Sequence, residues 1–272
     1  MKPVRFDYER PVEIGAALAL MRDEGRVVKI IAGGQSLGPM LNMRLVQPEL
    51  LVDITAIPAL KRIEDHADHI IVGACVTHAD FEDRRVPDVT AGALPGVARG
   101  IAYRAVRNRG TVGGSLTHAD PSADWISILS AVGARVILRS PSGTREVPVE
   151  QYMLGALAAD LNPGELLEAV RIPKCSASAR WGYFKSCRKT GEFAHAIGAV
   201  LVDPDRGVFR AVMGATETRP ILVTERAALF AETGFSTGAA EEVAQAAGMA
   251  DLLDRRTHAV ALRRAFEQAD AA

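Results

Sequence analysis

The sequence contains little cysteine. Its three cysteines, Cys75, Cys175 and Cys187, lie far apart along 272 residues. No two of them form a C-x-x-C pair, and no histidines accompany them at zinc-finger spacing. Because an iron–sulfur cluster usually takes four cysteine ligands, we expect this chain alone to bind no cluster and no metal. Buried thiols without a chemical role are the favoured interpretation of all three.

Two further absences exclude other classes of protein. The 32 basic and 33 acidic residues leave a formal charge of −1, which argues against a nucleic-acid-binding role. Apolar runs such as residues 126–129 and 131–134 are short, whereas a membrane span needs about 20 residues. The N-terminus lacks the apolar core of a signal peptide. We therefore expect a cytoplasmic protein with no transmembrane segment.

Hydrophobic periodicity predicts a chain of helices and strands that is long enough for two domains. Strands are expected at residues 4–8, 27–31, 50–54, 69–76, 135–139 and 166–172, and helices at 12–24, 37–45, 86–106 and 123–132. After a small polar linker at 174–180, strands are expected at 181–187, 197–202 and 208–213. The last ~50 residues are predicted to be mostly helical.

This order of elements indicates an α+β fold. We expect a first domain over residues 1–175, made of two lobes at about 1–57 and 58–175. A C-terminal domain over residues 176–272 would follow, with an antiparallel sheet first and helices after it.

A first glycine-rich loop lies at residues 30–39 (IIAGGQSLGP), between a predicted buried strand and a short helix. Unpaired N–H groups at such a helix start can hold an anion. Gly33 and Gly34 have no Cβ atoms, so a phosphate could approach the backbone, and Gln35 and Ser36 offer further donors. A tight turn in which the glycines serve geometry alone explains this single loop equally well.

A second segment, residues 109–125 (RGTVGGSLTHADPSADW), repeats the paired glycines. Gly113 and Gly114 stand between the hydroxyl groups of Thr111 and Ser115. Two such loops about eighty residues apart are much less expected by chance than one. The pair therefore favours a mononucleotide or a flavin dinucleotide as ligand.

The acids that follow the second glycine pair suit the start of a helix. Asp120 is expected at the N-cap, Pro121 at the first helical position and Asp124 in the first turn. These acids could be only a cap and a dipole-favoured charge, or could accept a hydrogen bond from a ribose hydroxyl. Upstream, Arg107 and Arg109 could neutralise phosphate or could equally be exposed helix ends.

These motifs resemble those of a known family. Residues 32–37 (AGGQSL) with Arg44, residues 111–115 (TVGGS) and residues 119–124 (ADPSAD) resemble the FAD-binding medium subunit of molybdenum hydroxylases. That family includes the carbon monoxide dehydrogenase flavoprotein subunit and the FAD domain of xanthine dehydrogenase. The resemblance implies a two-lobed FAD domain of the vanillyl-alcohol oxidase and p-cresol methylhydroxylase type, followed by the family's C-terminal domain.

The resemblance also implies which residues would bind FAD. Those around the pyrophosphate would be Ile31, Ala32, Gly33, Gly34, Gln35, Ser36, Leu37, Thr111, Gly113, Gly114 and Ser115. Asp120 and Asp124 are also assigned to the cofactor, Asp124 by hydrogen bonding. The backbone of Leu167 would lie against the ring system, Lys185 would reach the flavin region, and Phe193 would pack on the isoalloxazine. Because the flavin performs the chemistry, no catalytic side chain is assigned.

By the same resemblance, the partners would be a molybdopterin-binding large subunit and a small subunit with two [2Fe–2S] clusters, in a dimer of heterotrimers. The chain would be an electron-transfer subunit that passes electrons from the clusters through FAD to an external acceptor. One alternative is a stand-alone flavin oxidase or dehydrogenase whose second domain covers a small organic substrate. Another is a nucleotide-binding scaffold without redox turnover.

Overall fold

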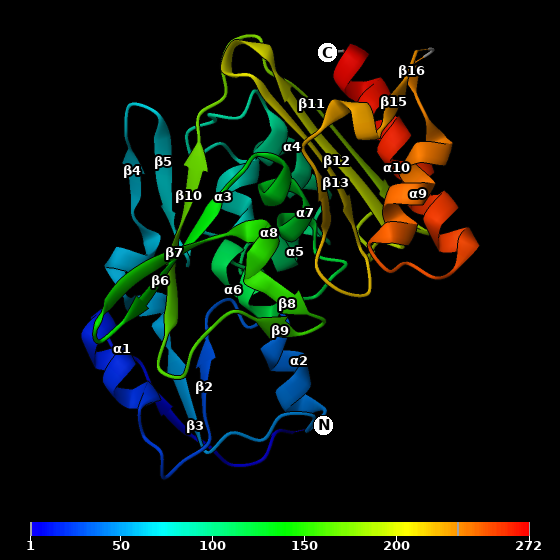
Figure 1. Cartoon of the computed structure of the whole chain (residues 1–272). Coiled ribbons are helices and arrows are strands. Elements are labelled where there is room, and N and C mark those ends of the chain that lie inside the picture. The colour runs from blue at the N-terminus through cyan, green and yellow to red at the C-terminus, as the bar shows by residue number, and fades with distance from the viewer. Residues whose placement is uncertain (1, 233, 272) are drawn as a thin grey trace.

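The computed structural model describes residues 2–232 and 234–271, and it mixes helices with sheets (Figure 1). The helices are α1 (Ile14–Met21), α2 (Leu37–Asn42), α3 (His78–Glu82), α4 (Ala93–Gly100), α5 (Arg104–Arg107), α6 (Val112–His118), α7 (Asp124–Ala131), α8 (Val149–Tyr152), α9 (Thr237–Ala246) and α10 (Leu252–Ala271). Short 3-10 helices lie at Ile54–Ala56, Pro58–Lys61, Pro204–Arg206 and Arg226–Ala228. None of the helices in the described ranges combines the length and apolar character that a membrane crossing requires.

A small parallel sheet begins the chain, at the bottom of Figure 1. Its strands are β1 (Asp7–Glu9), β2 (Val28–Ile31) and β3 (Leu50–Asp53), in the order β1-β3-β2. Leu18 of α1 packs with Leu50 and Val52 in a core of their own. The predicted alternation of strands and helices is confirmed here, although α1 is shorter than the expected 12–24. Because strands β2 and β3 are parallel, their carboxyl ends meet at the edge where the first glycine loop begins.

A five-stranded antiparallel sheet follows, in the order β4-β5-β10-β6-β7. Its strands are β4 (Ile63–Asp65), β5 (His69–Gly73), β6 (Arg135–Ser140), β7 (Gly143–Pro148) and β10 (Leu166–Pro173). The expected strands near 69–76, 135–139 and 166–172 are therefore present, whereas β4 and β7 were not predicted. A two-stranded hairpin, β8 (Met153–Gly155) and β9 (Ala158–Ala159), lies between β7 and β10.

The expected single helix over 86–106 is wrong, because this stretch forms α4 and α5 with a break between them. Ala102 adopts a left-handed backbone conformation, with φ of 42°, which a continuing helix does not allow. The Arg107 guanidinium donates to the carbonyl oxygens of Ile101 and Ala102 at 3.0 and 3.3 Å. A buried side chain from outside the break thus binds carbonyls that a helix would have used.

The C-terminal sheet is antiparallel, in the order β11-β12-β13-β14, and α9 and α10 lie on its outer side (Figure 1). Its strands are β11 (Arg180–Ser186), β12 (Ala196–Asp203), β13 (Val208–Gly214) and β14 (Ile221–Val223). Helix α10 packs so closely on β11 that a Cβ on Gly182 would lie 1.8 Å from the Ala265 carbonyl oxygen. Only glycine fits at this position. The expectation that the last ~50 residues are mostly helical is confirmed by α9 and α10, although β14 and the unpredicted hairpin β15 (Phe230–Ala231) and β16 (Gly234–Phe235) precede them.

Helix α7 joins the middle of the molecule to the C-terminal sheet. All eight of its residues are buried, and Trp125 is the largest fully buried side chain. Its core cluster also contains Ala199, Leu201 and Val212 from β12 and β13. The five-stranded unit and the C-terminal sheet therefore share one hydrophobic core, while the parallel sheet packs mainly around another.

Candidate functional site: two glycine pairs and their surroundings

The structure brings the two glycine-rich segments together. A Cβ on Gly33 would lie 2.0 Å from the carbonyl oxygen of Arg109 and 2.8 Å from the Cα of Gly110. A Cβ on Gly114 would lie 4.0 Å from the Cβ of Ala32. Residues about eighty positions apart in sequence are thus direct neighbours, as their common assignment to one ligand requires.

Each pair contains one glycine that faces inward. Gly33 is buried against the Arg109 backbone, and Gly113 is buried where a Cβ would lie 2.5 Å from the Cβ of Ala74 and 2.8 Å from its Cα. Real Cβ atoms do not tolerate such distances to backbone, so any side chain there would push two segments apart. Both inner glycines are therefore required by packing inside the protein.

Each pair also contains one glycine that faces outward. Gly34 is partly exposed and has φ of 71°, which residues with a Cβ rarely adopt. Gly114 is exposed, and a Cβ there would meet only the Thr111 hydroxyl closely, at 2.8 Å. The outer glycines are therefore the positions at which a ligand could approach the backbone.

The second segment is a helix and not the expected loop, and its N–H groups are already used. Thr111 caps α6 by accepting a hydrogen bond from Gly114 N–H at 3.0 Å. The neighbouring N–H groups of Val112, Gly113 and Ser115 donate to the carbonyl oxygens of Val76, Ala74 and Thr111. The first turn of α6 consequently offers no free backbone donor from Val112 to Ser115.

The first segment differs in this respect. None of the backbone N–H groups of residues 33–37 donates to another group in the part of the chain that the structure describes. Gln35 turns back and donates its Nε2 to the Gly33 oxygen at 2.9 Å, and Ser36 makes no side-chain cap to α2. A row of consecutive unpaired N–H groups is a concave anion site. The two segments therefore differ in their backbone donors, which are unpaired at residues 33–37 and paired at residues 112–115.

The expected cap at Asp120 is wrong in detail, because α7 begins at Asp124 and its N-cap is Ala123. Asp120 instead accepts from the N–H of Ser122 at 2.9 Å within a turn. Asp124 does lie in the first turn of α7, as predicted. The three residues between the two acids are thus a turn that leads into the helix.

Asp124 and Lys185 form a buried ion pair between α7 and β11. The Lys185 Nζ lies 2.9 Å from Oδ2 of Asp124, and the Tyr183 hydroxyl donates to Oδ1 at 2.7 Å. Burial and the neighbouring Asp124 carboxylate raise the pKa of Tyr183 well above its usual value. The structure therefore brings these two predicted site residues together, and it shows that the Asp124 carboxylate already has two partners.

Phe193 lies in the connection between β11 and β12 and is 70% exposed. After Phe193, this connection is fixed by a hydrogen bond in which Ser122 Oγ donates to the Ala194 carbonyl oxygen at 3.1 Å. Gly191, with φ of 88°, lies where a Cβ would be 2.6 Å from the Ala102 oxygen. An exposed phenyl ring is therefore carried on a segment that is fixed at both flanks to the middle of the molecule.

Leu167 is buried in β10 beside a β-bulge between Leu167 and Ala169. Within this bulge the Glu168 oxygen accepts the N–H of Ala74 at 2.9 Å. Ala74 is also the residue against which Gly113 packs. The bulge thus connects the strand carrying Leu167 to the support of the second glycine pair.

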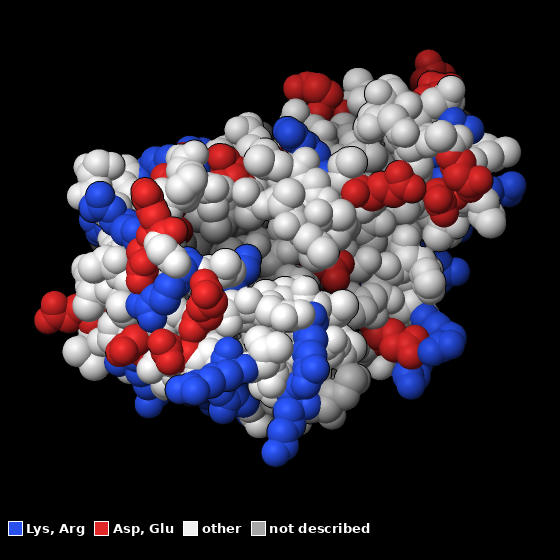
Figure 2. Space-filling model, turned by 90° about the horizontal axis from the view of Figure 1, so that it is seen from below, with Lys and Arg blue, Asp and Glu red and all other residues white. Residues whose placement is uncertain are grey.

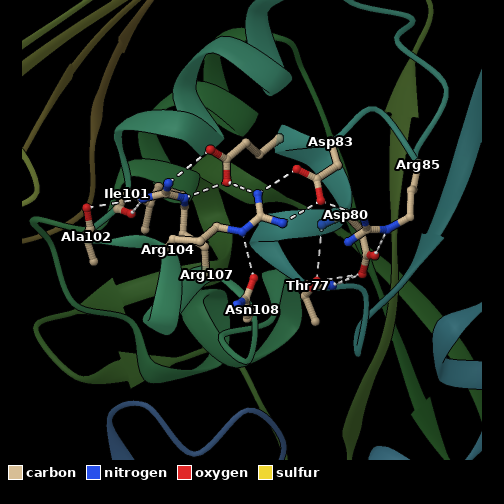
Figure 3. A network of polar contacts seen from close by, with 10 residues as sticks. Thr77, Asp80, Asp83, Arg85, Ile101, Ala102, Arg104, Arg107 and Asn108 are labelled. Carbon is tan, nitrogen blue, oxygen red and sulfur yellow. Dashed lines mark hydrogen bonds and ion pairs between the residues drawn. The ribbon is translucent and has the colours of Figure 1, made fainter.

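Arg107 and Arg109 have different surroundings, and the contacts of Arg107 are drawn in Figure 3. Arg107 is buried and forms two hydrogen bonds with Glu82, at 2.7 and 3.0 Å, and Arg104 also contacts Glu82. The exposed Arg109 makes no ion pair or side-chain hydrogen bond within residues 2–232 and 234–271. Both alternatives are therefore wrong for Arg107, which is a buried structural anchor, whereas the side chain of Arg109 is available to a ligand.

His78 belongs to this site although sequence reasoning missed it. Its Nδ1 accepts a hydrogen bond from the Trp125 indole at 2.9 Å, and its Nε2 lies 2.6 Å from where a Cβ of Gly110 would be. Burial and the nearby Arg107 lower the pKa of His78 to about 4, so the ring is neutral near pH 7. The sequence did contain one signal for this region. The capping box of Thr77 and Asp80 predicts a helix that begins at His78, as α3 does.

The face of the molecule seen from below carries no large field of one sign. Basic and acidic side chains are interspersed there, and the surface is hollowed near the middle of the view (Figure 2). Within the described residues, no group of three or more histidine, cysteine or acidic side chains is placed to hold a metal ion. The site is therefore defined by backbone donors and by the Asp124–Lys185 pair.

Comparisons with known proteins identify the family of the chain. Residues 4–175 match the family described as the FAD binding domain in molybdopterin dehydrogenase. The carbon monoxide dehydrogenase medium chain of Hydrogenophaga pseudoflava is 37% identical over 202 residues, which cover 74% of this chain and 70% of that protein. The caffeine dehydrogenase subunit beta of a Pseudomonas species is 35% identical over 203 residues, or 74% and 69% of the two chains.

Solved structures extend the likeness to the whole chain. A structure of carbon monoxide dehydrogenase from Hydrogenophaga pseudoflava matches with a TM-score of 0.88 and 32% identity, covering 100% of this chain and 99% of that one. Quinoline 2-oxidoreductase from Pseudomonas putida 86 matches with a TM-score of 0.85, 32% identity and the same coverage. The chain therefore belongs to the family of FAD-binding medium subunits of molybdenum hydroxylases, and it is an FAD-binding oxidoreductase subunit.

Proposed function

We propose that this chain is the electron-transfer subunit of a heteromeric molybdenum hydroxylase. It would take electrons from the [2Fe–2S] clusters of a small partner subunit and pass them to an external acceptor. The observation that carries the proposal is the row of unpaired N–H groups at residues 33–37, which faces the outer glycine of α6. Bound FAD supplies the redox chemistry, and the chain supplies binding, orientation and electrostatics.

In this proposal the two segments divide the binding of the pyrophosphate. The N–H groups of residues 33–37 donate to the phosphate oxygens, together with the Ser36 hydroxyl, and Ile31 and Ala32 form the end of the strand below. Gly114 leaves room for the ligand, and the Thr111 hydroxyl holds that turn in shape from within. Ser115 contributes its hydroxyl from α6, and Gly113 acts by packing.

Arg109 is the cation we assign to the pyrophosphate. Its backbone contacts Gly33, so its side chain starts where the two segments meet. An arginine side chain can form two parallel hydrogen bonds to a phosphate, which strengthens binding and fixes orientation. Arg107 cannot serve in this way because Glu82 and two backbone carbonyls already engage it.

For the rest of the cofactor we propose contacts at the junction of α7, β10 and β11. Lys185, held by Asp124, would face the flavin, and the exposed ring of Phe193 would pack on it. Leu167 would approach the ring system through its backbone, and Asp120 would border the site. A phenyl ring cannot donate a hydrogen bond, so Phe193 would act through shape and polarity.

The same proposal extends to fold details and partners. We propose a two-lobed FAD domain at residues 1–175, with lobes at about 1–57 and 58–175, and a C-terminal domain at 176–272. The relatives named medium chain or subunit of a dehydrogenase support a large and a small partner. For this chain we propose the molybdopterin-binding subunit and the two-cluster subunit, in a dimer of heterotrimers located in the cytoplasm.

Expression with and without the partner subunits tests the function. We expect the purified chain to show flavin absorbance that dithionite bleaches, and to be bleached by an organic substrate only in the assembled complex. Bleaching of the isolated chain by a small substrate would overturn the electron-transfer role and favour a stand-alone flavin enzyme. We call the proposed pyrophosphate site, formed by residues 33–37 and the outer face of Gly114, the cofactor cradle. A preparation without bound flavin, and without uptake of added FAD, would contradict this assignment.

A further inference from the structure

A second concave site lies at the far end of β10 from the cofactor cradle. Its cavity of about 360 Å³ is within the size range of small-molecule sites. The lining includes four basic side chains, from Arg135, Arg171, Lys174 and Arg206, and one acidic one, from Asp68. We call this the basic cavity.

Two of the basic residues that line the cavity, Arg135 and Arg171, repel each other. Arg171 of β10 is directly opposite Arg135 of β6 in the antiparallel register. Like charges at directly opposed positions destabilise a sheet. One carboxylate, Glu146, serves both guanidinium groups, at 3.1 Å from Arg135 and 3.6 Å from Arg171. The two arginines therefore share a single carboxylate as their direct ion-pair partner.

The other two cations are Lys174 in the linker and Arg206 in the 3-10 helix between β12 and β13. Lys174 pairs with Asp65 at 2.6 Å, and Arg206 donates to the Lys174 oxygen at 2.6 Å. Arg206 lies 3.8 Å from Asp203, whose carboxylate is buried and accepts from the N–H and hydroxyl of Ser176. Asp65 and Asp203 do not line the cavity, and the one acidic lining residue, Asp68, pairs with His69 at 2.7 Å, so basic residues outnumber acidic ones around an entering anion.

The basic cavity is separate from the cradle. Its lining residue Pro173 ends β10, whereas Leu167 of the cofactor site lies near the start of the same strand. Six residues of strand at about 3.3 Å each place them about 20 Å apart. A ligand of the basic cavity would therefore not compete with FAD.

We propose that the basic cavity binds a small phosphate-bearing molecule, through the arginine pair of β6 and β10 together with Lys174 and Arg206. Arginine guanidinium groups match the geometry of phosphate oxygens, and an anion between Arg135 and Arg171 would remove their repulsion. Such a ligand would contact the five-stranded sheet, the linker and the 3-10 helix between β12 and β13 at once. It would therefore stabilise the folded chain by an amount that grows with the logarithm of its concentration once that concentration exceeds its Kd.

Titration of the FAD-loaded full-length chain with inorganic pyrophosphate, followed by calorimetry at constant ionic strength, tests the proposal. Loading with FAD keeps the probe out of the cradle. We expect saturable binding that Arg171→Gln weakens about tenfold or more, as expected for the loss of a charge-assisted contact. Lys174→Gln, on the linker, should also weaken binding. Arg99→Gln is the matched control, because Arg99 is exposed on α4 and makes no ion pair within the described residues.

A second measurement separates a ligand site from a structural role. Without pyrophosphate, Arg171→Gln should unfold at the same or a higher temperature than the unmodified chain, because a repulsion is removed while the Arg135–Glu146 pair remains. At one pyrophosphate concentration, Arg171→Gln should gain less stability than the unmodified chain and Arg99→Gln, which should gain equally. Equal binding by Arg171→Gln, or no binding beyond that of sodium chloride, would overturn the proposal. Loss of partner-subunit association in Arg171→Gln without any anion binding would also overturn it, and would identify a docking surface.

Discussion

The two glycine pairs look alike in sequence and work differently in the structure. At residues 33–37 the backbone donors are unpaired, and the outer glycine, Gly34, adopts a left-handed conformation. At Gly113 and Gly114 the donors are consumed by Thr111 and by the backbone at Ala74. The first segment therefore keeps the donors that our proposal assigns to the pyrophosphate, whereas the donors of the second segment are used within the protein.

Within each pair the division is between inside and outside. Gly33 and Gly113 are glycines because another backbone occupies the space of a Cβ. Gly34 and Gly114 are glycines at the surface, where the ligand is proposed to lie. Packing therefore requires glycine at the first position of each pair. At the second position the reason is the backbone conformation or the proposed ligand.

The largest expected effect separates the inner from the outer glycines. Gly113→Val should abolish stable folding, because its Cβ would lie 2.5 Å from the Cβ of Ala74 and overlap the Ala74 backbone as well. Gly38→Ala is the control, since nothing lies within 4 Å of its Cβ in α2. Urea denaturation of the FAD-free chain measures both. A stable Gly113→Val chain that merely lost FAD would show that Gly113 serves the ligand after all.

The arginines upstream of the second segment provide the next comparison. Arg107→Gln should lower the free energy of unfolding by about 3 kcal/mol, because it breaks a buried ion pair with Glu82. Arg109→Gln should leave that free energy unchanged and weaken FAD binding about tenfold. Denaturation together with flavin-fluorescence titration distinguishes them. Unchanged FAD affinity in Arg109→Gln would refute its role without affecting the proposed function of the chain.

Acid should weaken the support of the second segment through His78. Its pKa of about 4 in the folded state lies below the ordinary 6.5, so the unfolded chain binds the proton more tightly. This contribution to stability is complete above pH 6.5 and is lost as pH falls toward 4, to a total of about 3 kcal/mol. His78→Gln, which keeps an acceptor for Trp125, should flatten that part of the stability–pH curve. A curve of unchanged slope would contradict the assignment.

The smallest expected effect is at the outer glycine of α6. Gly114→Ala should cost about 1 kcal/mol of folding stability, because its Cβ disturbs the Thr111 cap at 2.8 Å. The same Cβ would enter the space proposed for the pyrophosphate, so FAD affinity should fall about tenfold, or about 1.4 kcal/mol. Equilibrium dialysis of FAD, read beside the unfolding curve, checks the two values. Undiminished affinity would remove Gly114 from the ligand surface.

Much of the framework was predictable because it depends on local pattern. The strands at 27–31, 135–139 and 166–172 follow from their apolar runs, and α7 follows from a helical period with acids at its start. Strands β4 and β7 were missed because their sequences are largely polar, and β14 was missed because its apolar run is only three residues long. The helix over 86–106 failed because Arg107, folded back from outside the break, binds the carbonyls at 101 and 102.

By itself, the sequence determined that two glycine-rich segments occur, that they match an FAD-binding family, and that the surrounding elements alternate as they do. Only the tertiary structure decided which donors are free, because Ala74 and Val76 satisfy α6 from a distant part of the chain. It also decided that Asp124 is paired with Lys185 and that His78 is buried beneath Gly110. Local pattern specifies backbone conformation, whereas the availability of a polar group depends on what the rest of the chain packs against it.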